Sequence, residues 1–446
     1  MKRKHEDWNR RLILILSALL GATVFVAAPA QAARTFNVKS FGATGNGVTD
    51  DTASILAALA AANAVPGSTL EFPSGNYLYS SILPATGISV VGHNATLTSA
   101  NDASWLLLSG HCVSVQDIIF SSQVANALAL TVSQANGFQV AGNKFNAGLG
   151  LDMVVTQSCN GQIQSNKMLL SDKSSVMIMG NSSLISIKSN SVTSSSSTTS
   201  GILLGSSNNI SLTSNRMTDV AGCIGLGSCQ TVSVSHNVFS NFSNFGVVSS
   251  DDSNVTISDN QFTTTHAFGS DVRLDSDVNA LVSHNLFETG AVGVQSIGCT
   301  NVQVSGNTIN KMQFYGLLFN SDRTIIARGN TITRTGTAIS TGAESNLTVN
   351  GNQIAQCQNQ AVYAPGCLGT ESISNNEIRG CGLAVTDPAA VIFVDSPGAT
   401  SIPITHNFYS GNTANLQFFI RCIQPQPPAK VSGNATSTML PNQIGP

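Results

Sequence analysis

Charged residues are scarce in this chain. Of its 446 residues only 10% are Asp, Glu, Lys or Arg, and the formal net charge is −3. A protein that binds nucleic acid needs a basic surface to neutralise phosphates, so this composition argues against a nucleic-acid partner. Hydrophobic residues make up 42% of the chain. Ser, Thr, Asn and Gly take the place of charge, as expected where side chains line long strands and tight turns.

Metal-ligand spacing is also missing. The chain has nine cysteines, an odd number, and none follows the spacing of a zinc site. No cofactor is predicted, and although a calcium ion could bind, no site for one is recognisable. Cys357 and Cys381 are 24 residues apart, which is one step of the repeat described below. A disulfide between them is geometrically allowed, and the pattern leaves it open whether one forms.

The N-terminus carries an apolar run of 17 residues, Leu12 to Ala28, after a basic start. Ala30-Gln31-Ala32 then follows the small-x-small pattern of a cleavage site. We interpret residues 1–32 as a secretory signal and expect a periplasmic or secreted protein, with no stable membrane insertion once the signal is cleaved. An uncleaved anchor is the alternative, since the run is at the short limit for spanning a bilayer.

What the chain does have is a repeated phrase: an asparagine with an apolar residue three before it and another two after it. Successive copies are 22 to 25 residues apart, except for a last step of 31. A fixed period of this size predicts a solenoid, in which each repeat buries its face by stacking on the next. The twelve copies are Asn143, Asn166, Asn190, Asn215, Asn237, Asn260, Asn285, Asn307, Asn330, Asn352, Asn376 and Asn407.

The local pattern indicates which solenoid this is. Apolar and polar residues alternate before each asparagine, as at Val255 and Ile257, and a second short strand comes about a dozen residues earlier. The frame of a leucine-rich repeat does not occur. Short strands in coils of this length predict a parallel β-helix with coils about 4.8 Å apart. Each asparagine amide would then bond its counterpart in the next coil and form a buried ladder.

Residues 36–92 carry the most specific motifs: Phe36-Asn-Val-Lys-Ser-Phe-Gly-Ala-Thr-Gly-Asn-Gly-Val-Thr-Asp-Asp-Thr, then Leu70-Glu-Phe-Pro-Ser-Gly-Asn-Tyr and Val90-Val-Gly. This stretch resembles the N-terminal signature of the pectate-lyase-like superfamily, which includes rhamnogalacturonases, polygalacturonases, certain epimerases and phage tailspikes. Between these motifs, Ile55, Leu56 and Leu59 give a short helix one apolar face, and Asp51 or Thr52 can cap it. Such a helix would cover the open end of the solenoid.

These observations predict an all-β fold, a right-handed parallel β-helix of about twelve or more coils with an N-terminal capping helix. We place the β-helix domain at residues 33–422, the helix at about 51–63 and the regular coils at about 125–412. The segment 423–446 is rich in Pro, Gln and Ser, and we predict an extended or partly disordered tail there.

The resemblance implies polysaccharide cleavage, but the catalytic motifs of the family do not carry over. Asp251-Asp252 is the one Asp-Asp pair in the coils, while the Gly-His-Gly and Arg-x-Lys motifs of polygalacturonases are missing. The calcium and arginine signature of pectate lyases is not recognisable either. The leading hypothesis is an exported glycoside hydrolase or polysaccharide lyase. A non-catalytic carbohydrate-binding surface protein and a polymer-level uronate epimerase are the alternatives.

One region concentrates the titratable groups. If Val272 and Leu274 point inward, then Arg273 and Asp275 point outward and Asp277 falls in the following turn. Asp252 occupies the column of Asp277 one coil earlier, and Asp322 occupies it two coils later. Adjacent coils would bring Asp252 and Asp277 to roughly 5 Å, a separation that suits an acid paired with a base or nucleophile.

Further side chains surround this region. His266 lies in an enlarged turn one coil below Arg273, and we include it among the candidate catalytic residues with the four aspartates and the arginine. Lys311 and Tyr315 lie above them and are candidates for binding the polysaccharide. The plainer alternative is that the aspartates complete turns and that Arg273 pairs with Asp275 on the surface.

Overall fold

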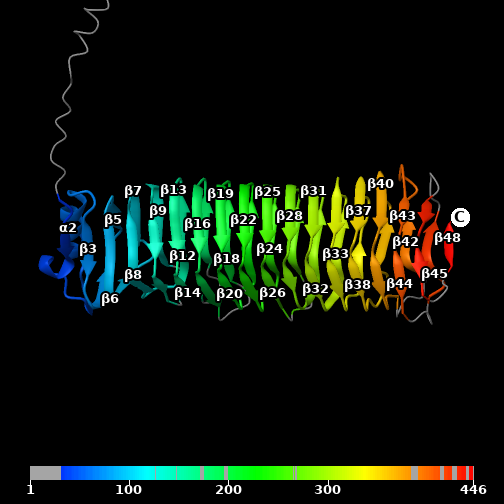
Figure 1. Ribbon diagram of the computed structural model, residues 1–446. Helices are drawn as coiled ribbons and strands as arrows, with labels where there is room; N and C mark the ends of the chain where they lie inside the picture. Colours follow the sequence, from blue (N-terminus) through cyan, green and yellow to red (C-terminus); the bar gives the residue numbers. More distant parts are fainter. Residues whose placement is uncertain are drawn as a thin grey trace, which may run out of the picture. The chain divides into compact units, whose positions relative to one another are not determined.

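The computed structural model describes residues 32–444 except 126, 147, 171–174, 195–198, 265, 267–268, 383–389, 412–415, 424–428 and 438–440. From Arg34 onward the strands wind into about 15 coils stacked along one axis (Figure 1). Corresponding strands of successive coils pair in parallel. The predicted parallel β-helix is therefore confirmed. The predicted signal segment lies outside the described residues except for Ala32.

The strands form three faces, which we call A, B and C in the order the chain visits them within a coil. Face A comprises β5 (Leu83–Thr86), β7 (Leu106–His111), β9 (Ala127–Asn136), β12 (Leu149–Thr156), β15 (Ser175–Gly180), β18 (Ser200–Gly205), β21 (Gly222–Gly227), β24 (Phe245–Ser250), β27 (Ser270–Asp275), β30 (Gly290–Ile297), β33 (Met312–Asn320), β36 (Thr337–Ser340), β39 (Val362–Pro365), β42 (Ala390–Asp395), β45 (Phe418–Ile423) and β48 (Asn442–Ile444).

Face B comprises β1 (Thr35–Asn37), β3 (Thr69–Phe72), the first parts of β6 (Ser89–Ser99) and β8 (Ser114–Ser122), β10 (Gln139–Ala141), β13 (Cys159–Gln164), β16 (Ser183–Lys188), β19 (Asn208–Thr213), β22 (Gln230–Ser235), β25 (Ser253–Ser258), β28 (Val278–Ser283), β31 (Thr300–Ser305), β34 (Ile325–Arg328), β37 (Asn346–Asn350), β40 (Thr370–Ser374), β43 (Pro403–Thr405) and β46 (Lys430–Ser432).

Face C comprises β2 (Asn46–Asp50), β4 (Gly75–Tyr79), the second parts of β6 and β8, β11 (Lys144–Phe145), β14 (Lys167–Leu170), β17 (Ser191–Ser194), β20 (Arg216–Thr218), β23 (Val238–Ser240), β26 (Gln261–Thr263), β29 (Leu286–Phe287), β32 (Thr308–Asn310), β35 (Thr331–Thr333), β38 (Gln353–Ala355), β41 (Glu377–Arg379), β44 (Phe408–Ser410) and β47 (Ala435–Thr436).

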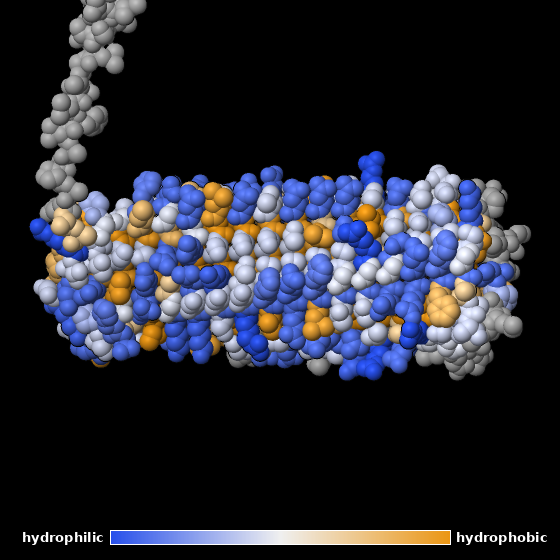
Figure 2. Space-filling view, in the orientation of Figure 1, coloured by the Kyte–Doolittle hydropathy of each residue, from blue (hydrophilic) through white to orange (hydrophobic). Residues whose placement is uncertain are grey.

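The core fills the space between the three faces. Inward residues alternate with outward ones along each strand, so that Val255 and Ile257 of β25 are buried. The apolar residue two after each ladder asparagine stacks on its counterpart, as with Phe262 and Phe287, whose ring centroids are 4.9 Å apart. Because equivalent positions line up from coil to coil, side chains of one kind run in rows along the surface (Figure 2).

The asparagines form the predicted ladder at the corner between faces B and C. The Nδ2 of Asn260 donates to Oδ1 of Asn285 at 3.0 Å and to the carbonyl of Val234 at 2.8 Å. The turn is set by the preceding residue, which adopts the left-handed conformation, for example His284 with φ 56°. Each amide is thereby satisfied in the core without contact with water.

The ladder continues beyond the twelve predicted positions. Asn407 donates from its backbone N–H and from Nδ2 to Oδ1 of Asn434, at 2.8 and 2.9 Å. Strands β46 and β47 pair with β43 and β44 around it. Residues 423–446 were predicted to form an extended or partly disordered tail. Asn434 does not match the repeated phrase, because Thr436 occupies the position two residues later at which the other copies have an apolar residue.

The predicted helix is α2 (Thr52–Asn63), which covers the N-terminal coils after the 3-10 helix η1 (Val38–Phe41) (Figure 1). Asp51 occupies the N-cap position, but its side chain does not cap the helix. Its carboxylate instead accepts from the backbone N–H groups of Thr44 and Gly45, at 2.7 and 3.0 Å. Asp51 thus holds the glycine-rich loop against the start of the helix.

The two cysteines of the possible disulfide lie in one column, in the turns from face C to face A. Both are buried free thiols, and the N–H of Cys357 points at the Sγ of Cys381 at 3.4 Å. No helix among the described residues is long and apolar enough to cross a membrane.

Candidate functional site

A second polar column runs inside the corner between faces A and B. In it, a side-chain acceptor of one coil takes a hydrogen bond from the backbone N–H of the equivalent residue in the coil before. Serines fill it first, with Ser158 N–H donating to Ser182 Oγ at 3.2 Å. Asp252 N–H donates to Asp277 Oδ1 at 2.8 Å, and Cys299 N–H donates to Asp322 Oδ1 at 2.7 Å. The column satisfies backbone groups at this corner, as the asparagines do at the next.

This column holds three of the predicted catalytic residues. Asp252, Asp277 and Asp322 do share one column, but their side chains are buried, with exposed fractions of 1%, 0% and 1%. Burial raises the pKa of all three carboxyl groups, and that of Asp277 reaches about 7. A carboxyl group that is closed off from solvent cannot touch a polymer, so the prediction that these three aspartates are catalytic is corrected. Hydrogen bonding between coils is their visible role.

The other predicted residues lie on the outer surface around β27. Arg273 projects outward from the strand, and its Nε donates to Asp275 Oδ2 at 2.9 Å; the side chains are 46% and 26% exposed. The ion pair with Asp275 uses Nε of Arg273. The two terminal nitrogens of the guanidinium group have no partner among the described residues. Such a group can receive a carboxylate from a ligand in bidentate fashion.

The turns from face C to face A bring further charges to the same surface. His266 is exposed, and its turn is tied to the next coil because Thr264 N–H donates to the carbonyl of Thr289 at 3.2 Å. Glu288 lies in that next turn and accepts from Gln261 Nε2 at 2.7 Å and Thr263 Oγ1 at 2.8 Å. These bonds lower the pKa of Glu288, and the ammonium group of Lys311, in the turn after, adds to the effect.

Tyr315 completes this surface. It begins the regular part of β33, two coils beyond Ser270 in the same register column, and its side chain is partly exposed. The neighbouring Phe314 is 43% exposed. We refer to His266, Arg273, Asp275, Glu288, Lys311 and Tyr315 together as the β27–β33 patch.

Sequence reasoning missed two carboxyl groups here. Glu288 belongs to a turn, where no periodicity applies. Strict alternation with Val272 would point Asp271 outward, yet its side chain is 1% exposed and burial raises its pKa well above the usual range. Gly290 in the next coil leaves room for it, since a Cβ there would lie 2.9 Å from Asp271 Oδ1. The neighbouring coils have a glycine at the position of Asp271, Gly246 in one and Gly293 in the other. These glycines are the signal that could have revealed that this position points into the core.

Within the described part of the chain, no group of three or more His, Cys, Asp or Glu side chains is arranged to hold a metal ion. The β27–β33 patch offers two cations, one imidazole, two carboxyl groups and an aromatic ring on one exposed surface.

Two family models match the chain. Residues 35–208 match the model described as rhamnogalacturonase A/epimerase, pectate lyase-like, and residues 269–419 match the right-handed β-helix region. The chain is a pectate-lyase-like right-handed β-helix protein. The resemblance predicted from residues 36–92 is thus confirmed, and so is the hand of the helix.

Curated relatives of this pectate-lyase-like protein include mannuronan C5-epimerases of Azotobacter vinelandii. AlgE1 is 44% identical over 66 residues, which is 15% of this chain and 5% of the epimerase. AlgE4 is 57% identical over 42 residues, which is 9% of this chain and 8% of the epimerase. The chain therefore matches only a small part of each enzyme's length.

Solved structures share the fold of this pectate-lyase-like protein at low sequence identity. PfbA, a surface adhesin of Streptococcus pneumoniae, gives a TM-score of 0.56 at 14% identity, covering 74% of this chain and 93% of the adhesin. DFA-IIIase from Arthrobacter chlorophenolicus A6 gives a TM-score of 0.51 at 14% identity, covering 69% and 95%. An adhesin and an enzyme have the same coil architecture, so the fold alone does not assign an activity.

Proposed function

We propose that the protein acts on an anionic polysaccharide that lies across the β27–β33 patch. The observation that carries this proposal is that Arg273, Lys311 and His266 are all exposed on face A or in the turns leading into it, within three successive coils. In the chain as a whole only 10% of residues are charged. A uronate polymer presents a carboxylate on every unit, which the two cations can pair with. Tyr315 offers a partly exposed ring on which a sugar can stack.

The chemistry that these groups support best is abstraction of the proton at C5 of a uronate. Pairing the uronate carboxylate with Arg273 spreads the negative charge that develops when the C5–H bond breaks. The exposed imidazole of His266 takes the proton. The electron pair then forms the C4–C5 double bond while the C4–O bond breaks, and the leaving oxygen takes up a proton. This is polysaccharide cleavage by elimination, a lyase reaction.

Hydrolysis fits the patch less well. A glycoside hydrolase needs one carboxyl group that keeps its proton near neutral pH and one that is ionised. Glu288 is held ionised by its hydrogen bonds, which lower its pKa, and Asp275 is paired with Arg273. The carboxyl groups with raised pKa are the buried ones, which no sugar reaches.

A uronate epimerase is the second candidate. It begins with the same C5–H abstraction and ends by returning a proton to the other face of the sugar, with no bond broken at C4. The identity with mannuronan C5-epimerases over 66 residues favours it. Both candidates act on a polymer outside the cytoplasm, in line with the N-terminal segment that we interpret as an export signal.

We expect the purified protein to raise the ultraviolet absorbance of alginate or polygalacturonate solutions, because elimination creates unsaturated uronate ends, and to leave neutral glucans unchanged. Replacing Arg273 by Ala should lower the rate roughly 10²-fold, the usual cost of removing one group that stabilises a developing charge. Arg328→Ala is the matched control, since Arg328 is exposed on face B.

Each outcome of this assay has one meaning. If the absorbance does not change but NMR shows a changed ratio of uronate epimers, the protein is an epimerase and not a lyase. New reducing ends without absorbance would show hydrolysis and overturn the elimination chemistry. No change in any uronate polymer, or equal rates for Arg273→Ala and Arg328→Ala, would overturn the proposed site.

A further inference from the structure

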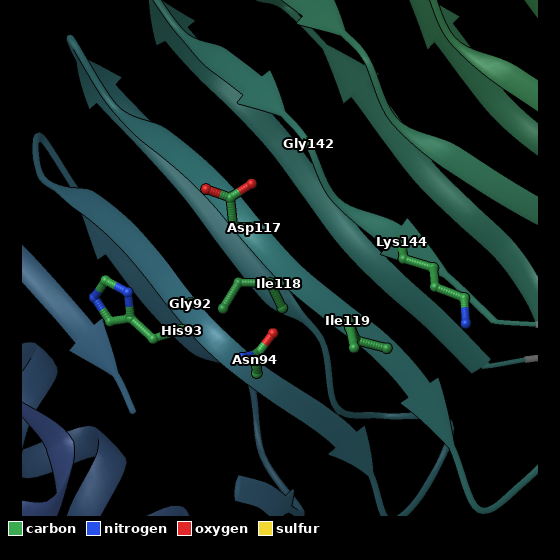
Figure 3. A pocket seen from close by; sticks show the side chains of 8 residues that line it. All are labelled: Gly92, His93, Asn94, Asp117, Ile118, Ile119, Gly142 and Lys144. Carbon is green, nitrogen blue, oxygen red and sulfur yellow. The ribbon is translucent and has the colours of Figure 1, made fainter. Parts of the chain in front are cut away.

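A concave surface lies far from the patch along the chain, at the corner between faces B and C in the N-terminal coils. The hollow has a volume of about 500 Å³, within the range of about 300–1,000 Å³ that is typical of small-molecule sites. It spans strands β6, β8 and β11, and its lining includes His93, Asn94, Asp117 and Lys144 (Figure 3). We call it the β6–β11 groove.

The groove exists because the corners of successive coils differ in length. Between paired positions of β6 and β8, three residues of β6 (Gly92, His93 and Asn94) stand opposite Asp117 alone. The longer corner of β6 forms one wall. On the far side, a Cβ at Gly142 would lie 2.4 Å from Asp117 Oδ1. The missing side chain at Gly142 therefore leaves the space that the Asp117 carboxylate occupies.

The charges in the groove are only partly matched within the protein. His93 Nε2 lies 3.7 Å from Glu71 Oε1. Asp117 and the half-buried Lys144 form no ion pair with any described residue. A ligand that matches both must carry an anionic group for Lys144 and hydroxyl donors for Asp117. A neutral sugar would leave the ammonium group unmatched, and a cationic sugar would be repelled by it.

We propose that the β6–β11 groove is a second binding site for a uronate unit of an acidic polysaccharide. The uronate carboxylate pairs with Lys144, its hydroxyls donate to Asp117, and the amide of Asn94 donates to a ring or hydroxyl oxygen. The partly exposed side chain of Ile119 covers the apolar face of the sugar. The site holds a polymer without reacting with it, and a chain bound at both places gains avidity.

This proposal shares its ligand class with the proposed function but uses none of its residues, so the two can fail separately. The test uses the full chain with Arg273→Ala and Lys311→Ala, which silence the β27–β33 patch. Isothermal titration with mannuronate and galacturonate hexamers measures binding, and cellohexaose is the neutral probe. Lys144→Gln is added to this background, and Lys167→Gln is the matched control because Lys167 is exposed at the same register one coil further on.

We expect the background variant to bind one of the uronate hexamers and not cellohexaose. Lys144→Gln should weaken that binding at least about tenfold, as the loss of a hydrogen bond to a charged group implies, and Lys167→Gln should leave it unchanged. The proposal is overturned if the background variant binds neither uronate hexamer, if cellohexaose binds equally well, or if the two lysine variants behave alike. Binding here with no activity in the assay above would overturn the proposed function alone.

Discussion

Replacing Asn285 by Ala is expected to lower the free energy of unfolding by about 3–5 kcal/mol. Its Oδ1 accepts from the backbone N–H and Nδ2 of Asn260, at 2.9 and 3.0 Å. Its Nδ2 donates to the carbonyl of Ile257 at 2.8 Å and to Oδ1 of Asn307 at 3.1 Å. Alanine removes all four bonds. The buried N–H of Asn260 and the carbonyl of Ile257 lose their bonds to Asn285, each at a cost of about 1–3 kcal/mol, while Oδ1 of Asn307 keeps the backbone N–H of residue 285.

Asn434→Ala is the matched control at the end of the ladder. Asn434 is partly exposed, and water can replace the bonds that it makes to Asn407. We expect it to cost no more than about 1.5 kcal/mol. Chemical denaturation followed by circular dichroism measures both variants. If the two substitutions cost the same, the ladder is not what holds the central coils together.

Replacing Asp277 by Asn is expected to stabilise the protein above pH 7 and to leave its stability near pH 4 little changed. Burial raises the pKa of Asp277 to about 7 in the folded chain, against an ordinary value of 3.8. Between these values the folded chain binds a proton that the unfolded chain does not. Stability therefore falls as pH rises through this interval and levels off above it.

The carboxyl group of Asp277 accounts for on the order of 4 kcal/mol across that interval. Asparagine keeps an acceptor for the N–H of Asp252 and never ionises, so the variant should be more stable than wild type at pH 8 by about 2–4 kcal/mol. Glu344 and Glu371 are buried as well, with pKa values raised to about 7 and about 8. Ionisation of Glu344 and Glu371 adds to the loss of stability at alkaline pH in both wild type and Asp277→Asn.

Thermal unfolding from pH 4 to pH 9 measures this difference. Asp259→Asn is the control, because Asp259 lies on the exposed turn before Asn260 and its carboxyl group meets water in the folded and the unfolded chain. Equal pH profiles for Asp277→Asn and wild type would mean that the Asp277 carboxyl group is not buried in solution.

The coil architecture was readable from the sequence because its determinants repeat. An asparagine every 22 to 25 residues can be buried only if its counterparts stack on it, and alternation then assigns the inward side chains of each strand. The same logic placed Arg273 and Asp275 on the surface and put Asp252, Asp277 and Asp322 in one column.

Alternation fails where a strand bends or ends. Asp277 follows β27 after one turn residue, Ser276, and nothing in the spacing tells whether its side chain points inward or outward. In the structure it points inward and accepts from the N–H of Asp252. Asp271 and Val272 are adjacent and both buried, which strict alternation forbids. Glu288 and the lining of the β6–β11 groove lie at corners whose lengths vary between coils, so no periodic rule could find them.

We infer that the buried aspartates hold the coils together and propose that the β27–β33 patch meets the polysaccharide. The most direct test compares the rates at which wild type, Asp277→Asn and Arg273→Ala act on a uronate polymer, with folding checked by circular dichroism. We expect Asp277→Asn to keep the wild-type rate and Arg273→Ala to lower the rate roughly 10²-fold. A folded but inactive Asp277→Asn beside a fully active Arg273→Ala would contradict this proposal.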